Sequence, residues 1–259
     1  MIHPSLHSPD RRPDGEGSSL RVVLLTGADR LSLDSVAFSL ADSSDGACVV
    51  SYDVRADDDA PQGLDVVRTI TMPADREDAG RARTESRPLD DCCLTCCVKH
   101  NAGHVMETLK TTASVFLVSL PVGVEATPVA QYLNDMVALG QWGDGTGSCV
   151  IANAVGLDEF EERFFDDDRL MLAGSDEDDG VFEDRSTGAV VSRLIHEAAH
   201  VLELPVIGVG CLAGHVDLDG GCSCSRIIRS IAGRGAVVHE DAHTVGLGDL
   251  VTCGQAVGC

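Results

Sequence analysis

Short apolar runs rich in β-branched residues alternate along this chain with segments of helical spacing. Leu20–Leu25 (LRVVLL) comes before a helical pattern from Leu33 to Leu40, and Ser114–Leu120 comes before another over Val129–Leu139. Strands that are apolar on both faces are typical of parallel sheets buried between helices. We therefore predict an α/β fold with a doubly wound, mostly parallel sheet.

The same periodicities place the other elements of the sheet. Strands are expected at Ala47–Val54, Cys149–Asn153, Val201–Val209 (broken by Pro205) and Ala236–Val238, and helices at Asn101–Thr111, Leu157–Phe165, Thr187–Ala199 and Ser225–Ile231. Two polar stretches, Ala56–Asp91 and Asp166–Ser186, lack a sustained pattern and are expected to be irregular and solvated. Ligands of such sheets bind at the carboxyl ends of the strands, so the functional loops should gather there.

The charge balance excludes several classes of partner. The 259 residues include 42 acidic and 19 basic side chains, which gives a formal net charge of −23. Such a field repels a phosphate backbone or an anionic lipid surface, so neither a nucleic acid nor a membrane is an expected partner. No stretch approaches the roughly 20 apolar residues of a membrane-spanning helix.

Composition along the chain suggests one folded domain. Residues 1–19 have no apolar run and are predicted to be a disordered leader, residues 20–245 to form the domain, and residues 246–259 to be a C-terminal tail. Because the leader does not have the pattern of a signal peptide, we expect a cytoplasmic protein. Thiols stay reduced in that compartment and are available for metal or redox chemistry.

Metal-binding residue types are concentrated in one short stretch before a predicted helix. Four cysteines and two histidines fall within thirteen residues, at Cys92, Cys93, Cys96, Cys97, His100 and His104. A helix starting near Cys97 would turn both imidazoles toward the thiols, because residues four apart share a helix face. Thiolate and imidazole donors suit zinc or another thiophilic divalent ion. The alternative is a set of inert buried cysteines with two solvated histidines.

The first strand and helix are where a phosphate-binding loop of the GxxxxGK[ST] type would lie. Alignment from Gly27 puts Ser32, Leu33 and Asp34 at the last three motif positions, with Ser35 next. Leu33 supplies no cation for the phosphates, and Asp34 repels them. Neither Lys99 nor Lys110, the two lysines of the chain, follows a glycine-rich turn. Gly27, Ser32 and Ser35 are therefore interpreted as a vestigial nucleotide site, and binding of GTP with magnesium is expected to be weak or lost.

The cysteine stretch and the order of the surrounding motifs resemble the CobW-type P-loop GTPases, a family that includes metallochaperones. The matching residues are Cys93–Lys99 (CLTCCVK), Leu117–Leu133 and Asp184–Leu204, within a similarity that covers roughly Leu20 to His239. Where the family has its guanine-specificity motif, this chain has PVIG from Pro205 to Gly208. The family's smaller C-terminal domain is also expected to be absent.

This resemblance implies a P-loop GTPase-type fold and a role in metal homeostasis, delivery or recruitment. By resemblance, Cys93, Cys96 and Cys97 would bind the metal, aided by Cys92, His100 or His104. The expected partner is a metal-recipient or recruited protein, and a second copy of the chain is another candidate. Little or no GTP hydrolysis is expected.

Two sequence patterns favour other functions. His196–His200 (HEAAH) and His239–His243 (HEDAH) both match H-E-x-x-H, which on a helix can bind zinc and place a glutamate as the general base of a hydrolase. The second follows a predicted strand, so the hydrolase alternative depends on His196, Glu197 and His200. The pair Cys93 and Cys96 is also a C-x-x-C that could cycle through a disulfide in a thiol-redox protein. Zinc hydrolase and thiol-redox protein are therefore the alternative functions.

The remaining cysteines and acidic runs give weaker signals. Cys48 and Cys149 lie in predicted strands and are expected in the core. The C-terminal thiols have irregular spacing that fits no zinc-ribbon pattern, although the pair Cys222 and Cys224 could form a second thiolate site. The acidic runs near Asp166 and Asp176 are interpreted as solvated surface.

Overall fold

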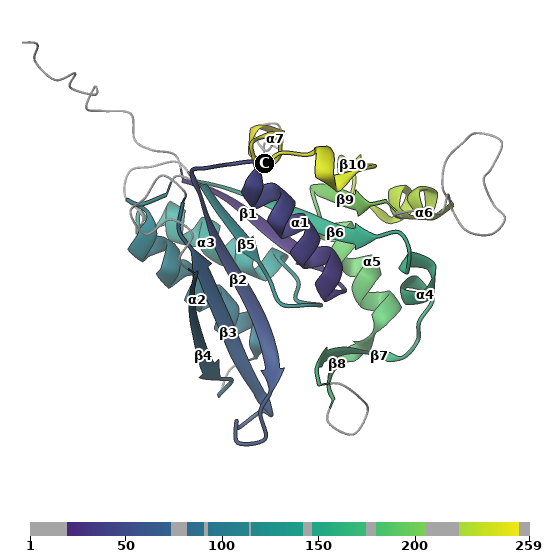
Figure 1. Cartoon of the computed structure of the whole chain (residues 1–259), viewed down its shortest axis with the longest axis horizontal. Coiled ribbons are helices and arrows are strands. Elements are labelled where there is room, and N and C mark those ends of the chain that lie inside the picture. Colours follow the sequence, from purple (N-terminus) through teal and green to yellow (C-terminus); the bar gives the residue numbers. More distant parts are fainter. Residues whose placement is uncertain are drawn as a thin grey trace, which may run out of the picture.

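The computed structural model describes residues 20–73, 82–90, 93–113, 115–141, 147–174, 180–205 and 223–253. Its centre is an eight-stranded sheet (Figure 1). The strands lie in the order β10 (Val237–His239), β9 (His200–Leu204), β6 (Gly147–Gly156), β1 (Leu20–Gly27), β5 (Val115–Ser119), β2 (Ala47–Ala56), β3 (Leu64–Thr71) and β4 (Ala82–Pro88). Every pairing is parallel except β2–β3 and β3–β4. The predicted α/β class with a mostly parallel sheet is confirmed.

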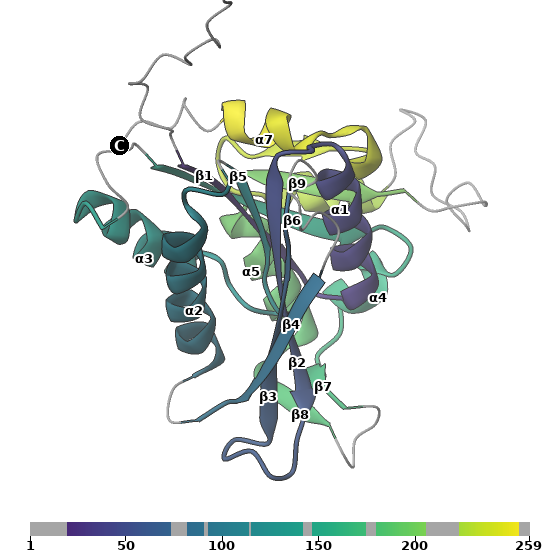
Figure 2. The same ribbon diagram turned by 60° about the vertical axis from the view of Figure 1, so that its left-hand side comes forward.

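Helices cover both faces of the sheet (Figure 2). One face carries α1 (Arg30–Asp42) and α7 (Leu247–Cys253), which pack with Val23 and Leu25 of β1. The other face carries α2 (Leu94–Leu109) and α3 (Thr127–Ala138), which pack with Val22 and Leu24. Farther along that second face lie α4 (Phe160–Phe164), α5 (Thr187–Glu197) and α6 (Ser223–Ile231). The alternation of β1 side chains between two cores explains why this strand is apolar throughout.

Two strands lie in the stretch from 56 to 91 that was predicted to be irregular. β3 and β4 form an antiparallel extension of the sheet, with Arg68 opposite Glu85 and Thr69 opposite Thr84. The prediction was wrong because the strands at this edge carry polar side chains that are satisfied across the pairing. The Arg68 guanidinium contacts the Glu85 carboxylate at 2.6 Å, and the two threonine hydroxyls lie 3.0 Å apart.

The acidic stretch after Phe165 also contains secondary structure. β7 (Arg169–Ala173) pairs with β8 (Val181–Ser186) in a separate two-stranded antiparallel sheet. The prediction of a solvated loop from 166 to 186 was therefore wrong over these strands. Leu170 and Ala173 are buried in this hairpin, and they anchor it to the domain.

The ordered chain continues past the boundary that was predicted at residue 245. Leu247 and Leu250 of α7 are 1% and 0% exposed and belong to the core that α1 also covers. This helix packs as part of the domain, whereas the predicted tail began at residue 246. The predicted leader, residues 1–19, lies outside the described residues. Within the described part of the chain, none of the helices has the length and apolar character needed to cross a membrane.

Candidate metal and thiol site at the start of helix α2

The helix that carries the cysteine motif begins earlier than predicted. Cys93 has extended backbone angles and is the N-cap of α2, and its carbonyl accepts the hydrogen bond of the Cys97 N–H at 3.0 Å. Cys93 is exposed, and Cys96 is half-buried in the first helical turn. The C-x-x-C spacing thus places one thiol at the open end of a helix and the second within its first turn.

The position of Cys93 favours its thiolate form. The pKa of the Cys93 thiol is lowered, chiefly by the backbone N–H of Cys96, then by the Cys96 side chain, while burial acts in the opposite direction. The positive charge of Lys99 and the backbone N–H of Thr95 lower it further. The free N–H groups of the first helical turn thus stabilise the thiolate of the N-cap residue, as expected at a helix N-terminus.

Lys99 is a contributor that the sequence analysis did not assign to this site. Its Nζ atom lies 5.8 Å from the centre of the Tyr132 ring, which holds the cation against α3. One signal was available in the sequence, since Lys99 is one of just two lysines and stands within one helical turn of Cys96.

Three of the other predicted metal ligands, Cys97, His100 and His104, form no group of three or more ligands with these two thiols in the described structure. Cys97 is half-buried and packs against the core, close enough to Tyr52 that a negative charge on its sulfur would raise the pKa of the Tyr52 hydroxyl. The His100 ring packs edge-on against Tyr132, with centroids 5.1 Å apart, and His104 lines a groove beside β3 and β4. Cys92 lies outside the described residues.

The expectation that both histidines turn toward the thiols is therefore wrong for this fold. In α2 (Leu94–Leu109), His104 follows Cys97 by seven residues and therefore lies roughly 10 Å farther along the helix axis. Among the described residues, no three His, Cys, Asp or Glu side chains are arranged to hold a metal ion. What the structure brings together is the Cys93–Cys96 pair.

The connection between β1 and α1 is short and has no room for a phosphate loop. The strand ends at Gly27, and α1 begins three residues later at Arg30. Asp29 is the N-cap, and its Oδ1 accepts a hydrogen bond from the Ser32 N–H at 2.7 Å. A carboxylate from the chain itself therefore occupies the helix end where a nucleotide phosphate would bind.

Gly27, Ser32 and Ser35, the predicted vestigial nucleotide site, are packed against other residues of the domain. Leu33 is 2% exposed, and a Cβ atom on Gly27 would lie 2.8 Å from Leu33 Cγ, so the two residues are in close contact. Ser32 is buried beside Gly156, and Ser35 is half-buried inside α1. Leu33 thus fills the core at the motif position of the phosphate-binding lysine.

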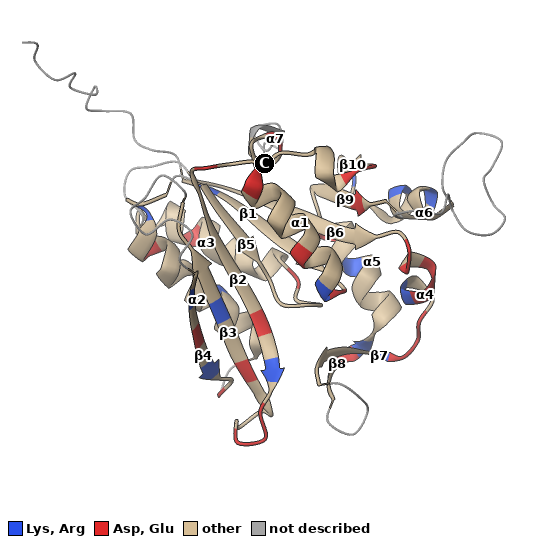
Figure 3. Ribbon diagram, viewed as in Figure 1, with Lys and Arg blue, Asp and Glu red and all other residues tan. Residues whose placement is uncertain are grey.

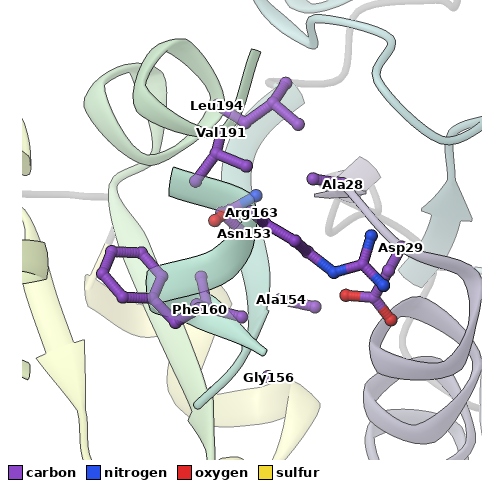
Figure 4. A pocket seen from close by; sticks show the side chains of 10 residues that line it. Ala28, Asp29, Asn153, Ala154, Gly156, Phe160, Arg163, Val191 and Leu194 are labelled. Carbon is purple, nitrogen blue, oxygen red and sulfur yellow. The ribbon is translucent and has the colours of Figure 1, made fainter. Parts of the chain in front are cut away.

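A polar cavity nevertheless lies at the carboxyl ends of the strands. Its volume is about 750 Å³, and it extends from the β1–α1 turn to the β7–β8 hairpin. Arg30 crosses it to pair with Asp53 of β2. A small adjoining cavity is lined by Asn153, Phe160 and Leu194, and Figure 4 shows the Arg163 side chain directed toward Asp29 there. The Arg163 guanidinium also pairs with Glu159.

Neither H-E-x-x-H sequence forms a zinc-binding helix. Helix α5 ends at Glu197, Ala198 is extended, and His200 is the first residue of β9. His196 contacts the Ile231 carbonyl oxygen through Nδ1 at 3.1 Å. The two histidines therefore point to different neighbours, and the predicted helical context of the motif is wrong.

Glu197 is also engaged in a structural role. Its carboxylate accepts hydrogen bonds from the Ala126 N–H at 2.7 Å, the Thr127 N–H at 3.0 Å and the Thr127 hydroxyl at 2.6 Å. These groups form the N-terminus of α3, whose orphan N–H donors need acceptors. In this arrangement the carboxylate is not available as a general base.

One histidine from each H-E-x-x-H sequence meets the other across the β9–β10 pairing. His200 Nδ1 lies 3.0 Å from His239 Nε2, and the rings are stacked with centroids 5.3 Å apart. Burial lowers the pKa of His200, and the charge of His239 lowers it further. Glu240 pairs with Arg229 at 2.7 Å, and His243 belongs to a 3-10 helix from Ala242 to Thr244.

Three of the remaining cysteines, Cys48, Cys149 and Cys224, lie in the core or pack against it. Cys48 is buried, and burial raises its pKa to about 11. Cys149 packs partly buried against the same core, and burial raises its pKa to about 12. Both confirm the prediction of core positions. Cys224 is buried in α6, whereas Cys222 lies outside the described residues.

A comparison of this chain with protein-family models, with curated proteins and with solved structures finds no match.

Proposed function

We propose that this protein is a CobW-like metal-binding protein that carries zinc or a similar thiophilic divalent ion to a recipient protein. The observation that supports this most directly is the pairing of an exposed, thiolate-favouring Cys93 with Cys96 at the N-terminus of α2. Thiolates are the preferred donors for zinc in proteins, and deprotonation is required before they bind it. A cytoplasmic location is part of this proposal, because thiols remain reduced there.

A two-thiolate site suits a carrier better than a permanent structural centre. Structural zinc has four protein ligands in a closed tetrahedron. Here Cys93 and Cys96 would hold the ion, with Cys97 or the sequence neighbour Cys92 as a further donor. The positions left open would accept ligands from the recipient protein, or from a second copy of the chain, so that the ion passes by ligand exchange.

The geometry of the β1–α1 turn supports a carrier that does not depend on a GTP switch. Asp29 already caps the helix end, and Leu33 is buried in place of a phosphate-binding lysine. Both residues oppose the close approach of a triphosphate. We therefore infer that coupling of metal delivery to GTP hydrolysis is weak or lost in this chain.

Elemental analysis of the purified full chain tests the metal proposal. We expect about one equivalent of a thiophilic metal in the wild-type protein and loss of most of it in the Cys93→Ser/Cys96→Ser double variant. Cys48→Ala is the matched control, because Cys48 is buried and its pKa is raised by burial. Equal metal content in the double variant and the wild type would reject the proposal.

Calorimetry with magnesium and GTP tests the second part independently. We expect no saturable binding at micromolar concentrations, either for metal-free or for zinc-loaded protein. Micromolar affinity in either form would overturn the assignment of a degenerate nucleotide site without affecting the metal result.

Thiol-redox activity is the second candidate, and one observation favours it. An exposed N-cap cysteine with a lowered pKa, followed three residues later by a second thiol, is the arrangement of many disulfide-exchange sites. Equilibration of metal-free protein in glutathione buffers would measure the potential of the Cys93–Cys96 pair. A reversible disulfide together with zinc content near zero would favour redox function over metal transport.

A further inference from the structure

A groove lies between α2 and the antiparallel edge of the sheet, away from the cysteine pair. Its volume is about 350 Å³. The antiparallel register puts Arg68 opposite Glu85 and Arg87 opposite Val66, so alternate residues of β3 and β4 face the helix. From α2, the groove is lined by Asn101, His104 and Thr108, which recur at helical spacing. The groove is thus built by two rigid elements.

Positive charge dominates this groove although the chain as a whole carries a formal net charge of −23. Three arginines, Arg68, Arg83 and Arg87, line it together with a single carboxylate, Glu85. Glu85 is shared between Arg68 at 2.6 Å and Arg83 at 2.8 Å. Arg87 has no carboxylate partner in the described part of the chain. The basic segments of β3 and β4 are visible in Figure 3.

Hydrogen bonding fixes the orientation of the donors at the floor of the groove. Asn101 Oδ1 accepts from the Tyr52 hydroxyl at 2.9 Å and from Arg68 Nη1 at 2.8 Å. The Asn101 amide nitrogen then remains a donor without an acceptor among the described residues. Arg68, with a side chain 14% exposed, has a buried Nε–H that also finds no acceptor there. The groove therefore has more hydrogen-bond donors than acceptors and more positive than negative charge.

We propose that this groove binds a small molecule with at least two oxyanion charges, either a phosphomonoester or a dicarboxylate. Guanidinium groups bind both kinds of oxyanion through paired N–H donors. Arg83 and Arg87 lie on the same face of β4, one on each side of Glu85, so they can contact two oxyanions of one ligand. The volume of about 350 Å³ suits a compact metabolite, since it is near the lower end of small-molecule sites.

Calorimetric titrations of the full chain with inorganic phosphate, O-phosphoserine, succinate and citrate test the proposal. We expect saturable binding of a phosphomonoester or of a dicarboxylate, and the difference between the two series identifies the source of the oxyanions. Arg87→Ala should weaken that binding at least tenfold, and Arg87→Lys should weaken it less, because lysine keeps the charge but loses the paired donors. The His104 ring signals in NMR spectra should shift on titration.

Arg55→Ala provides the matched control for charge. Arg55 is exposed near the end of β2 and does not line the groove, so its removal should leave affinity unchanged. Because the groove uses no cysteine, Cys93→Ser/Cys96→Ser should also retain binding, which separates this proposal from the metal proposal. Absence of saturable binding with every probe, or equal weakening in Arg55→Ala, would overturn it.

Discussion

Glu197 at the end of α5 holds Thr127 at the start of α3, accepting one hydrogen bond from its hydroxyl at 2.6 Å and another from its backbone N–H at 3.0 Å. The residue that a sequence motif offers as a catalytic base thus joins two helices. Hydrogen bonds to a charged group contribute about 1.5–3 kcal/mol each, and a lost helix cap costs about 1 kcal/mol.

Glu197→Ala is therefore expected to lower the free energy of unfolding by about 2–3 kcal/mol in urea titrations followed by circular dichroism. Metal content should not change. His196→Gln, at the neighbouring exposed position, serves as the control and should have a small effect. A Glu197→Ala protein of unchanged stability that keeps its zinc but loses a hydrolase activity of the wild type would contradict this role and restore the hydrolase interpretation.

A lysine at position 33 should destabilise the domain without creating a nucleotide site. Leu33 is 2% exposed, whereas Leu31 in the same helix is 82% exposed. Burying an ammonium group in place of packed methyl groups costs about 3 kcal/mol or more. Urea titrations should show this loss for Leu33→Lys and almost none for Leu31→Lys. Tight GTP binding by a folded Leu33→Lys protein would contradict the conclusion that the β1–α1 turn has no room for a phosphate.

The lowered pKa of Cys93 predicts the pH dependence of its alkylation. The thiolate is the reactive form, so a lowered pKa shifts the midpoint of the rate profile to lower pH than for a peptide cysteine. Iodoacetamide labelling of Cys93, located by mass spectrometry, measures this midpoint. Lys99→Met should move it upward, because a positive charge that favours the thiolate is removed. A midpoint equal to that of a peptide thiol would count against a helix-stabilised thiolate.

Glu203 in β9 should make the protein less stable as pH rises. Its side chain is 1% exposed, Oε2 accepts from the Ser225 hydroxyl at 2.7 Å, and Oε1 has no partner among the described residues. Burial raises the pKa of Glu203 in the folded protein. The unfolded chain therefore releases this proton at lower pH, and stability falls from about pH 4.3 upward through the folded pKa.

Glu203→Gln should remove that dependence. We expect the variant to be more stable than the wild type at pH 8, with a difference that shrinks toward pH 4.5, as measured by urea unfolding across pH. Glu162→Gln changes an exposed carboxylate and should leave the profile unaltered. A pH profile identical in wild type and Glu203→Gln would mean that the carboxylate is not buried in its charged form.

Elements with their own hydrophobic period were predictable from the sequence. β1, α1, β5 and α3 carry apolar side chains at the spacing that their burial requires, and the structure has them within a few residues of the predicted ranges. β3 and β4 lack this signal because their stabilising contacts, such as Arg68 with Glu85, form across the pairing. Such contacts depend on register, which local composition does not encode.

In the candidate site, too, one part was predictable from the sequence and another was not. The sequence by itself determined that Cys93 and Cys96 lie close together, because three residues of covalent chain and one helical turn leave them little choice. The positions of the other candidate side chains, His100, His104 and Glu197, were decided by the tertiary structure alone. It turned His100 to Tyr132, placed His104 beside the arginines of β3 and β4, and engaged Glu197 at α3. Those positions depend on how distant segments pack, and the spacing of residues along one helix carries no information about them.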